Sequence, residues 1–541
     1  MDNQELHFKS FPAENISYFK KNDLDYWLQS IDFDPLIERK PNFQHIENQI
    51  KVKQKTYSIR HHIRSIFNQQ YSNTKVSDAV KENIEKLSDE RTFSICCAHQ
   101  PLLLTGPAYF IYKICSTISV SRQLNNKFPN YHFVPVFYCG AEDHDLLEIN
   151  EVNFFSQKLS WKQEVNKVSG RQNLDGLDEI IDQLESIFKF ELNSQLFVQK
   201  LRNFSSLKEN QYEDFYREMI NDMFGQYGLL FFNPDDNFCK NLFSPIMCNE
   251  AEARFTQNNV LRTEKIMSQK GIVPQAGHRE INLFYIDEQN DRTRIIETNG
   301  RFQTTEGQDL GTLEHLKERI SKEAQNFSPN VLLRPLYQEF ILPNVAFVGG
   351  GAEISYWMQL RLSFQSQNIS FPILFRRLSA QYLDKNLNEQ ISALGLNFED
   401  FLDGESKSKE KYLSTHSKFP SIIHSFKDQW QQSIDALSQS DEIKSGPQQQ
   451  TFEIELKKLQ NQLHQFENKL LKSVQEKHDI QLRKIEKIHK QIFPLDNLQE
   501  RVQGGLIFYF KFGDTLLEKL IQVYQPEVAE YWLYSEATGL E

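Results

Sequence analysis

The densest group of chemically capable side chains is the run Glu142-Asp143-His144-Asp145, which follows an apolar stretch ending at Cys139. Three carboxylates and an imidazole are costly to bury without partners, because unpaired charge is poorly solvated in a protein interior. Such a run at the end of a strand therefore favours a functional site over a solvated turn. In an extended backbone, alternation would send Asp143 and Asp145 to one side and Glu142 and His144 to the other.

A second polar group follows an earlier apolar run, 93–98. His99 and Gln100 come directly after it, and Thr105-Gly106-Pro107 then opens a segment that carries Lys113. Backbone N–H groups at a helix start favour phosphate or carboxylate, although the phosphate-loop pattern G-x-x-x-x-G-K-[ST] is absent. Two imidazoles with nearby carboxylates would also suit a metal, but the H-E-x-x-H and zinc-deaminase signatures are absent, so we assign no metal ligands.

Glycines and arginines later in the chain offer further binding groups. Gly349-Gly350-Gly351 before Glu353 is either a turn that admits a ligand close to the backbone or a plain flexible turn. Arg334 and Arg377 carry planar donors that suit carboxylate or phosphate, but single arginines are more often surface charges.

The spacing of apolar residues predicts the elements that position these groups. Apolar runs at 93–98 and 133–139 flank a predicted helix over 107–124, which makes a βαβ unit. A parallel sheet of this kind binds ligands beyond the carboxyl ends of its strands, where both polar groups lie. Further strands are predicted at 228–232, 281–286, 294–297 and 345–348, helices in most of the first 90 residues, and helices and loops over 155–225.

Past residue 385 the pattern becomes helical and polar. An apolar seam with spacings of four and three runs through Phe452, Leu456, Leu459, Leu463, Phe466 and Leu470. This spacing predicts a coiled-coil arm, with 420–437 as its antiparallel partner across a loop containing Ser445-Gly446-Pro447. The alternative is a long helix packed on the main body. We expect a core over 1–385 with connecting insertions, a coiled-coil arm over 386–500, and a segment over 501–541 that packs back on the core.

Composition excludes several classes of function. With 61 Lys+Arg and 73 Asp+Glu among 541 residues, the net charge is -12, which gives no electrostatic footprint for nucleic acid or an anionic membrane. The chain shows no signal-peptide pattern and no apolar stretch of the roughly 20 residues needed to span a bilayer. Its six cysteines lack C-x-x-C spacing. These features predict a soluble, cytoplasmic protein with reduced thiols.

The motifs together resemble the BshC family, the cysteine-adding enzymes of bacillithiol synthesis. The resemblance rests on His99-Gln100-Pro101, Thr105-Gly106-Pro107, Lys113, Pro135-Val136-Phe137, Glu142 to Asp145, Glu148-Ile149-Asn150, Arg334-Pro335, Gln338-Glu339, Leu342-Pro343, Gly349 to Gly351, Glu353 and Tyr356-Trp357. Tyr138 stands where that family pattern has tryptophan, and a glycine replaces a common proline within the Gly349 to Gly351 run. Neither departure removes a proposed chemical group.

This resemblance implies a ligase that joins the carboxyl group of cysteine to the amine of glucosaminyl malate, the last step of bacillithiol synthesis. It implies an α/β fold with a Rossmann-like, nucleotidyltransferase-type core, helical insertions and a long coiled-coil arm that forms a homodimer. Joining a carboxylate to an amine requires activation of the carboxyl group, for which ATP is a reasonable donor, but the residues leave the donor open.

The resemblance also implies roles for the site residues. His99 and Thr105 to Pro107 would lie at the nucleotide or activated-carboxyl end. Asp143, His144 and Asp145 would orient the amine, remove its proton or bind the ammonium group of cysteine, because an amine must be neutral to attack. Arg334 or Arg377 would hold the malyl carboxylates. The remaining predicted binding residues are Gln100, Thr105, Gly106, Lys113, Glu142, Gly350 and Glu353.

Two other classes of function remain open on the sequence. A metal-dependent amidohydrolase would use the same acidic and histidine cluster, and a noncatalytic scaffold would rest on the coiled coil alone.

Overall fold

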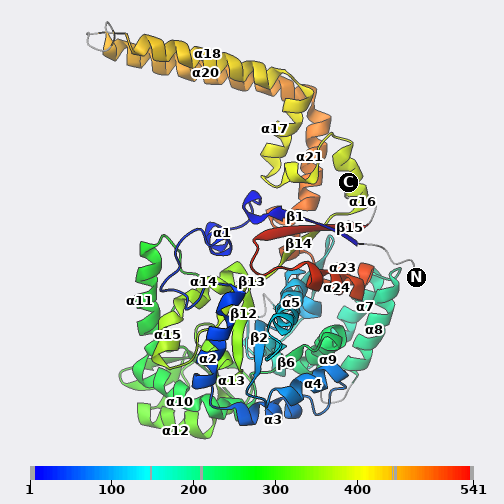
Figure 1. Cartoon of the computed structure of the whole chain (residues 1–541), viewed down its shortest axis with the longest axis vertical. Coiled ribbons are helices and arrows are strands. Elements are labelled where there is room, and N and C mark those ends of the chain that lie inside the picture. Colours follow the sequence, from blue (N-terminus) through cyan, green and yellow to red (C-terminus); the bar gives the residue numbers. More distant parts are fainter. Residues whose placement is uncertain (1–5, 146–148, 207–210, 441–442, 444–447, 537–541) are drawn as a thin grey trace. The chain divides into compact units, whose positions relative to one another are not determined.

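The structure, a computed structural model, describes residues 6–145, 149–206, 211–440, 443 and 448–536. The chain divides into two compact units. The first comprises Met1–Ala13, Phe19–Gln381 and Glu500–Leu533, and the second comprises Glu14–Tyr18, Tyr382–Gln499 and Tyr534–Glu541. Segments that are far apart in the sequence therefore build each unit (Figure 1).

The centre of the first unit is a five-stranded sheet in which all neighbouring strands are parallel. Its strands are β2 (Thr92–His99), β3 (His132–Cys139), β6 (Leu230–Phe232), β12 (Asn344–Gly349) and β13 (Ile373–Arg376), in the spatial order β13-β12-β2-β3-β6. The chain starts in the middle at β2, builds outward to β6, and returns to add β12 and β13 on the other side. The strand order therefore reverses between β2 and β12, as in a doubly wound Rossmann-like fold.

These strands are nearly continuous apolar runs because both faces of the sheet are covered. Every side chain from Thr92 to Ala98 is buried, and successive side chains of a strand point to opposite faces. Helix α5 (Tyr109–Lys127) packs on β2 and β3, and α14 (Gly351–Gln359) packs on β12 and β13. The βαβ unit predicted from the sequence is thus confirmed, with α5 beginning two residues after Pro107.

The amino-terminal region is mainly helical, as predicted. Ser77 caps one of its helices by accepting a hydrogen bond from Val80 N. The helices are α1 (Lys21–Leu28), α2 (Ile46–Thr56), α3 (Arg60–Gln70) and α4 (Asp78–Lys86). The exception is a strand, β1 (Leu6–Pro12), which belongs to a three-stranded sheet of order β1-β15-β14 with β14 (Ser379–Tyr382) and β15 (Glu530–Glu536). Its partners come from the other end of the chain, so local spacing could not reveal it.

An insertion of helices and one hairpin separates β3 from β6. Its elements are β4 (Glu151–Phe154), β5 (Gln157–Ser160), α7 (Leu177–Ile187), α8 (Leu192–Ser205) and α9 (Tyr212–Phe224). The three helices agree with the prediction for 155–225. The antiparallel β4–β5 hairpin was missed, because each strand has only four residues.

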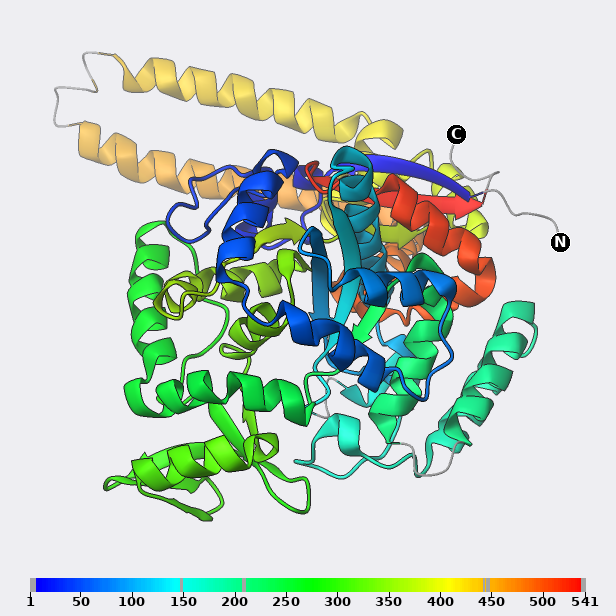
Figure 2. The same cartoon turned by 60° about the horizontal axis from the view of Figure 1, so that its bottom comes forward.

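A second insertion, between β6 and β12, carries a separate antiparallel sheet of order β10-β9-β8-β7-β11, here called the appended sheet (Figure 2). Its strands are β7 (Leu283–Ile286), β8 (Arg292–Thr298), β9 (Arg301–Thr304), β10 (Asp309–Gly311) and β11 (Phe327–Pro329). The strands predicted at 281–286 and 294–297 are confirmed as β7 and β8, and they belong to this sheet. The insertion also contains α10 (Asn237–Ala253), α11 (Phe255–Gln269), α12 (Leu313–Lys322) and α13 (Arg334–Ile341).

The first unit is completed by α15 (Arg361–Ser366) and by the late segment Glu500–Leu533. That segment contains α23 (Leu506–Phe512) and α24 (Asp514–Val523), which pack on α8 and α5 respectively. The short helix α22 (Gln499–Val502) lies at the point where the chain enters it.

The second unit is helical. Its helices are α16 (Lys385–Ser392), α17 (Glu405–His416), α18 (Phe419–Ser438), α20 (Gln449–Lys477) and α21 (Asp479–Ile492). Helices α18 and α20 lie side by side (Figures 1 and 2), and Lys427 Nζ pairs with Glu467 Oε2 between them at 2.9 Å. The predicted connecting loop at Ser445-Gly446-Pro447 lies outside the described residues. Across the part of the chain that the structure describes, no helix is both long and apolar enough to cross a membrane.

Candidate functional site

The polar groups after β2 and β3 lie together at the carboxyl edge of the parallel sheet. The carbonyl oxygen of His99 accepts a hydrogen bond from Gly140 N at 2.7 Å. Gln100 Nε2 donates to Asp143 Oδ2 at 3.1 Å. This edge, next to the reversal of strand order, is where doubly wound sheets bind ligands. We call it the strand-end crevice.

His99 is engaged at both ring nitrogens. The Tyr109 hydroxyl lies 3.0 Å from Nε2, and the carbonyl oxygen of Gln100 lies 3.4 Å from Nδ1. Because a carbonyl oxygen only accepts, Nδ1 carries the hydrogen and Nε2 accepts from Tyr109. Burial, followed by the positive charge of Lys113, holds the pKa of His99 well below its usual range. His99 is therefore a neutral imidazole at neutral pH.

The loop from β2 to α5 has an unusual backbone. Leu104, Thr105 and Gly106 have φ angles of 47°, 67° and 59°, a region that favours glycine. Glycine is required at position 106, because an added Cβ would lie 2.6 Å from Leu102 Cδ1. Gly505 N donates to the Gly106 carbonyl oxygen at 2.9 Å, so the late segment of the chain holds this loop in place.

Lys113 bridges the two sides of the reversal in strand order. Its Nζ lies 2.6 Å from Glu353 Oε2 and donates to the Ala98 carbonyl oxygen at 2.9 Å. Glu353 Oε2 also accepts from Gly350 N at 2.9 Å. The Lys113 side chain is only 1% exposed. These contacts tie α5 to the start of α14 and fix the spacing of the loops around the crevice.

The glycine run after β12 is shaped by a contact within the chain. None of Gly349, Gly350 and Gly351 has a positive φ. A Cβ on Gly351 would lie 2.0 Å from Asp23 Cγ, and Asp23 Oδ1 pairs with Arg376 Nε at 2.9 Å. The buried ion pair of Asp23 and Arg376, which belongs to the protein itself, therefore occupies the space next to the Gly351 backbone.

The acidic run after β3 forms a turn. Asp143 N donates to the Gly140 carbonyl oxygen at 3.1 Å, so the backbone does not continue the extended strand. The predicted alternation of side chains is therefore wrong, and Asp143 and His144 both lie beside Arg292. Asp145 is exposed. Glu148, part of the same motif in the sequence, lies outside the described residues.

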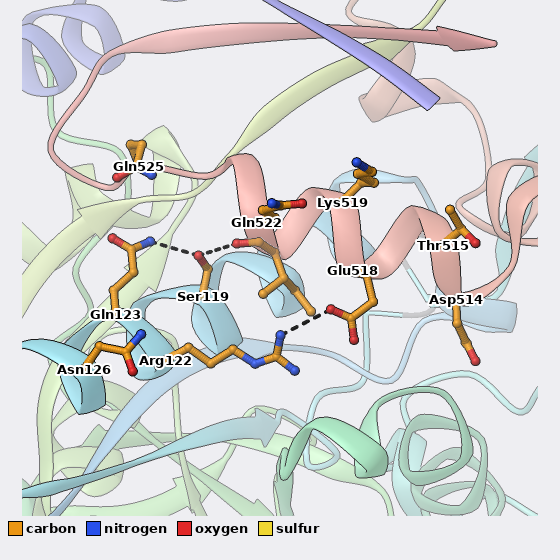
Figure 3. A pocket seen from close by; sticks show the side chains of 11 residues that line it. Ser119, Arg122, Gln123, Asn126, Asp514, Thr515, Glu518, Lys519, Gln522 and Gln525 are labelled. Atoms are coloured by element: carbon orange, nitrogen blue, oxygen red, sulfur yellow. Dashed lines mark hydrogen bonds and ion pairs between the residues drawn. The ribbon is translucent and has the colours of Figure 1, made fainter. Parts of the chain in front are cut away.

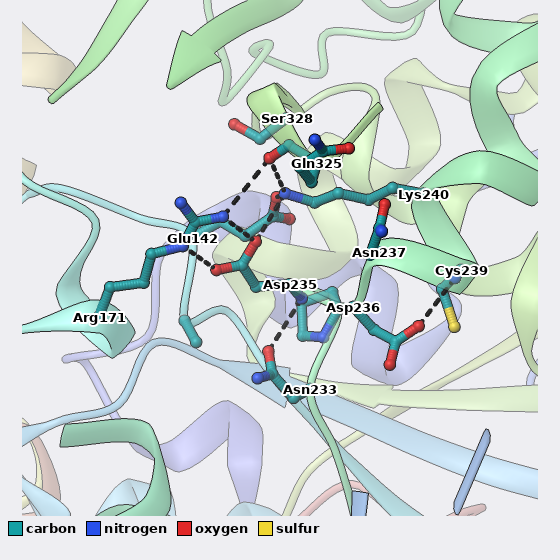
Figure 4. A network of polar contacts seen from close by, with 12 residues as sticks. Glu142, Arg171, Asn233, Asp235, Asp236, Asn237, Cys239, Lys240, Gln325 and Ser328 are labelled. Carbon is teal, nitrogen blue, oxygen red and sulfur yellow. Dashed lines mark hydrogen bonds and ion pairs between the residues drawn. The ribbon is translucent and has the colours of Figure 1, made fainter. Parts of the chain in front are cut away.

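Glu142 belongs to a buried network of charges (Figure 4). Lys240 Nζ lies 2.7 Å from Glu142 Oε1 and 2.6 Å from Asp235 Oδ1, and Arg171 Nε lies 2.6 Å from Asp235 Oδ2. Burial raises the pKa of Glu142, whereas at Asp235 the two cations outweigh burial and lower the pKa. In this network Glu142 anchors the turn to the end of β6 and to α10.

Arg292, from β8 of the appended sheet, contacts two side chains of the acidic turn. Its Nη1 lies 2.9 Å from His144 Nδ1 and 3.6 Å from Asp143 Oδ1. Its guanidinium stacks 3.9 Å from the ring centre of Phe284, and its Nε donates to Ser328 Oγ at 2.8 Å. No local sequence signal marks Arg292 as part of the site, because it lies on an antiparallel strand of a distant insertion.

The two predicted anion-binding arginines differ in their partners. Arg377 Nη2 lies 2.8 Å from Glu500 Oε1, and the Arg377 side chain is buried. Arg334 donates to the neutral oxygens of Gln338 and Tyr356, both at 2.9 Å, and its guanidinium lies over the Tyr138 ring. Within the described ranges Arg334 has no carboxylate partner, so it is the better placed of the two to bind an anion.

Among the described residues of the first unit, side chains line two cavities near the elements discussed above. One of about 310 Å³ adjoins the charge network and is lined by polar side chains that include Arg171, Glu213 and Asp235. A larger one of about 630 Å³ lies between α5 and α24, beside the ion pair of Arg122 and Glu518 (Figure 3). The larger cavity is lined by the second half of α5, which ends near the amino end of β3. It therefore lies away from the strand-end crevice.

Basic side chains of the protein itself stand beside the acidic turn. Lys240 contacts Glu142, and Arg292 contacts Asp143 and His144. Among the residues that the structure describes, no group of three or more His, Cys, Asp or Glu is arranged to hold a metal ion. The acidic turn is thus built around arginine and lysine contacts.

A doubly wound parallel sheet, with polar loops gathered at the carboxyl edge beside its reversal point, is typical of a Rossmann-like α/β protein. Residues 11–378 match the model of the N-terminal Rossmann-like domain of bacillithiol biosynthesis BshC. Residues 380–536 match the model of the BshC C-terminal coiled-coil domain. The chain belongs to the BshC family.

Relatives match over nearly the whole length. A protein of Flavobacterium johnsoniae named "Putative cysteine ligase BshC" is 33% identical, covering 95% of this chain and 97% of its own. A protein of the same name from Flavobacterium psychrophilum is also 33% identical, covering 97% and 98%. One from Bacillus cereus is 28% identical and covers 83% of this chain and 86% of its own.

Proposed function

We propose that this chain is a ligase that forms an amide bond between the carboxyl group of cysteine and the amine of glucosaminyl malate, the last step of bacillithiol synthesis. The observation that carries the proposal is the family match, which spans 11–378 and 380–536. The arrangement of the strand-end crevice supports it, because the crevice combines neutral imidazoles and carboxylates with Arg334, which has no carboxylate within ion-pair distance among the described residues.

Arg334 is the residue we assign to the malyl carboxylates. Its hydrogen-bond partners, Gln338 and Tyr356, are neutral, so an incoming carboxylate would be its first charged partner within the described ranges. A planar guanidinium pairs with carboxylate through two parallel hydrogen bonds. Arg377 instead serves to anchor Glu500.

The loop from β2 to α5 is the part we assign to the activated carboxyl group of cysteine. It precedes the amino terminus of the 19-residue helix α5, where backbone N–H groups and the helix dipole favour negative charge. Thr105 Oγ1 is buried in this loop and has no hydrogen-bond partner among the described residues. Condensing a carboxylate with an amine requires an activating donor. ATP fits that need chemically, and the donor is to be identified in the assay below.

We also propose that the chain works in the cytoplasm as a homodimer. A reducing compartment agrees with its six cysteines, all of which are free thiols. A second copy would cover the apolar side chains that the α18–α20 hairpin leaves exposed, among them Leu437, Ile454, Leu459 and Phe466. Half-covered apolar seams of this kind favour helix association.

The test is thiol and precursor analysis by mass spectrometry in cells that lack this chain. The proposal expects glucosaminyl malate to accumulate and bacillithiol to disappear, and it expects wild type, but not folded His99→Ala or Asp143→Ala, to restore bacillithiol. Assays of the purified chain with cysteine, glucosaminyl malate and ATP, with and without a chelator, then identify the donor and any metal requirement. Unchanged bacillithiol in the deletion strain would overturn the proposal.

A further inference from the structure

The contact between Arg292 and His144 fixes which nitrogen of the imidazole carries the hydrogen. Arg292 Nη1 lies 2.9 Å from His144 Nδ1. A guanidinium has donors only, and it stays protonated in proteins. Nδ1 must therefore accept this hydrogen bond with its lone pair. A neutral imidazole whose Nδ1 accepts carries its single hydrogen on Nε2.

The geometry of Arg292 leaves it little freedom to release this contact. Its side chain is 6% exposed. Nε donates to Ser328 Oγ at 2.8 Å, Nη2 donates to the Pro329 carbonyl oxygen at 2.9 Å, and the Phe284 ring lies beneath the guanidinium. Two hydrogen bonds and one stacking contact thus fix the guanidinium of Arg292, and its Nη1 points at the His144 imidazole.

The other charges around His144 do not reverse this preference. Asp143 Oδ1 lies 3.8 Å from Nδ1, farther than Arg292, and it already accepts a hydrogen bond from His144 N at 2.8 Å. Asp145 and Arg294 act on the ring only through their charges. Burial, and then the positive charge of Arg292, lower the pKa of His144. The His144 side chain is 29% exposed, so part of it can be reached by a ligand.

We propose that Arg292 is a positioning residue that holds His144 as a neutral hydrogen-bond donor, through Nε2–H, to the oxyanion formed in the amide-forming step. This assignment rests on the proposed function. The amine nitrogen attacks the activated carboxyl carbon, and the π electron pair of the C=O bond moves to its oxygen, where Nε2–H donates. The proton of the attacking amine passes to a carboxylate of the same turn, Asp143 or Asp145. The oxyanion then re-forms C=O and expels the oxygen leaving group of the activated carboxyl.

The first test reads the tautomer directly and needs no activity. The full-length chain is labelled with ¹⁵N-histidine, and the His144 signals are assigned by their loss in His144→Gln. The proposal expects an unprotonated Nδ1 and a protonated Nε2 at pH 7. A hydrogen on Nδ1, or a doubly protonated ring at that pH, would overturn it, whatever the reaction of the enzyme is.

The second test separates a hydrogen-bond donor from a base. The side-chain N–H of glutamine lies near the position of Nε2 but cannot take a proton, whereas asparagine reaches only the position of Nδ1. We expect His144→Gln to keep kcat within about tenfold of wild type, and His144→Ala and His144→Asn to lose about 100-fold, the usual effect of removing one oxyanion donor. Equal losses in all three variants would overturn the donor role.

The third test concerns Arg292 itself. Arg292→Met removes the donor that faces Nδ1, so the hydrogen of the neutral ring can move to Nδ1, next to Asp143 Oδ1, and leave Nε2 without one. We expect kcat to fall by about 10- to 100-fold and the ¹⁵N signals of His144 in this variant to show hydrogen on Nδ1 at pH 7. Arg301→Met, which removes an exposed arginine of the same sheet that is paired with Asp309, is the matched control and should leave the tautomer and kcat unchanged. If Arg292→Met keeps the wild-type tautomer, or if Arg301→Met changes it equally, the positioning role is wrong. Should Arg292→Met fail to fold, the tautomer measurement on wild type still decides the proposal.

Discussion

Arg334 differs from the neighbouring arginines of the first unit in the charge of its contact partners. Arg171, Arg292, Arg376 and Arg377 each lie within 4 Å of a carboxylate, at 2.6, 3.6, 2.9 and 2.8 Å. Arg334 contacts neutral groups in the part of the chain described here. A charge placed in this way can gain a substrate carboxylate without first losing one from the protein.

Replacing Arg334 should therefore affect one substrate selectively. We expect Arg334→Met to lower kcat/KM for glucosaminyl malate by about 10- to 100-fold, mainly through KM, because hydrogen bonds to charged groups contribute about 1.5–3 kcal/mol. The KM for cysteine should change little. Steady-state kinetics with each substrate varied in turn provides the measurement. Arg361→Met, which removes an arginine 3.7 Å from Glu38, is the control, and equal losses for both substrates would contradict the assignment.

Glu213 should make folding stability depend on pH. Burial raises its pKa to about 7 despite the neighbouring Arg217. Because this pKa is above the unfolded value, the folded state binds the proton more tightly, and the resulting stability is complete at low pH and is lost as pH rises toward 7. This single group should contribute about 3 kcal/mol across that range.

The measurement is denaturant unfolding of wild type and Glu213→Gln at pH 5 and pH 7.5. The stability difference in favour of wild type should shrink as pH rises. Glu252→Gln, which removes an exposed carboxylate paired with Lys317, should leave the pH dependence of wild type unchanged. A difference that is constant or grows with pH would show that Glu213 is ionised in the folded protein throughout.

The part of the site that follows β2 and β3 could be predicted from the sequence, because the order of the strands alone brings these residues together. His99, Gln100 and Asp143 directly follow apolar strands, and parallel strands bring their carboxyl ends to one edge. Arg292 and Lys240 could not be indicated in this way, since they reach the turn from insertions far along the chain. Alternation failed for Glu142 to Asp145 because a hydrogen-bonded turn, which local polarity does not distinguish from a strand end, begins at Gly140.

At the level of elements, the junction of β12 and α14 depends on a close approach at a single glycine. A Cβ on Gly351 would lie 2.0 Å from Asp23 Cγ, whereas a Cβ on Gly350 would lie 3.5 Å from Glu353 Oε2. We expect Gly351→Ala to destabilise the protein by about 1–3 kcal/mol, the usual cost of overpacking. Gly350→Ala, one residue away, should cost about 0.5 kcal/mol or less, because substitutions that meet only ordinary contacts have small effects.

Calorimetry or denaturant unfolding of the two variants tests this pair. Equal stability would mean that Asp23 and Arg376 rearrange freely and do not fix the start of α14. The same comparison explains the limit of the sequence analysis at this turn. Three glycines in a row predict a tight junction, but only the position of Asp23, far earlier in the chain, decides which glycine is indispensable.

The fold was predictable where one element carries its own signal. Continuous apolar runs identified β2, β3, β6 and β12, because a strand buried on both faces has no polar alternation. The seam in α20 indicated a long helix for a different reason, since a spacing of four and three places apolar residues along one face of a helix. Elements without a clear local signal were missed, among them β1, whose partners β14 and β15 lie at the other end of the chain, and the β4–β5 hairpin, whose strands have only four residues each.

At the scale of the whole molecule, the first unit needs the late segment of the chain. Glu500 is fully buried, and its carboxylate pairs with Arg377 at 2.8 Å and accepts from Ala380 N at 3.1 Å. A chain truncated after residue 385 would leave Arg377 buried without its partner and would lose α23 and α24. Breaking one buried ion pair in this way costs about 3–5 kcal/mol, so we expect the truncated chain to be unfolded or insoluble by circular dichroism and sedimentation.

Shortening the arm should have the opposite outcome, because α18 and α20 are joined side by side at Lys427 and Glu467. Replacing residues 428–466 with a short Gly-Ser linker removes Leu437, Ile454, Leu459 and Phe466, the exposed apolar side chains assigned above to the dimer. We expect the shortened chain to fold and to sediment as a monomer, whereas we expect wild type to sediment as a dimer. A shortened chain that remains dimeric would show that the copies associate elsewhere. A monomeric wild type would contradict the proposed homodimer. It would not bear on the proposed chemistry of the strand-end crevice, which the precursor analysis and the kinetics test separately.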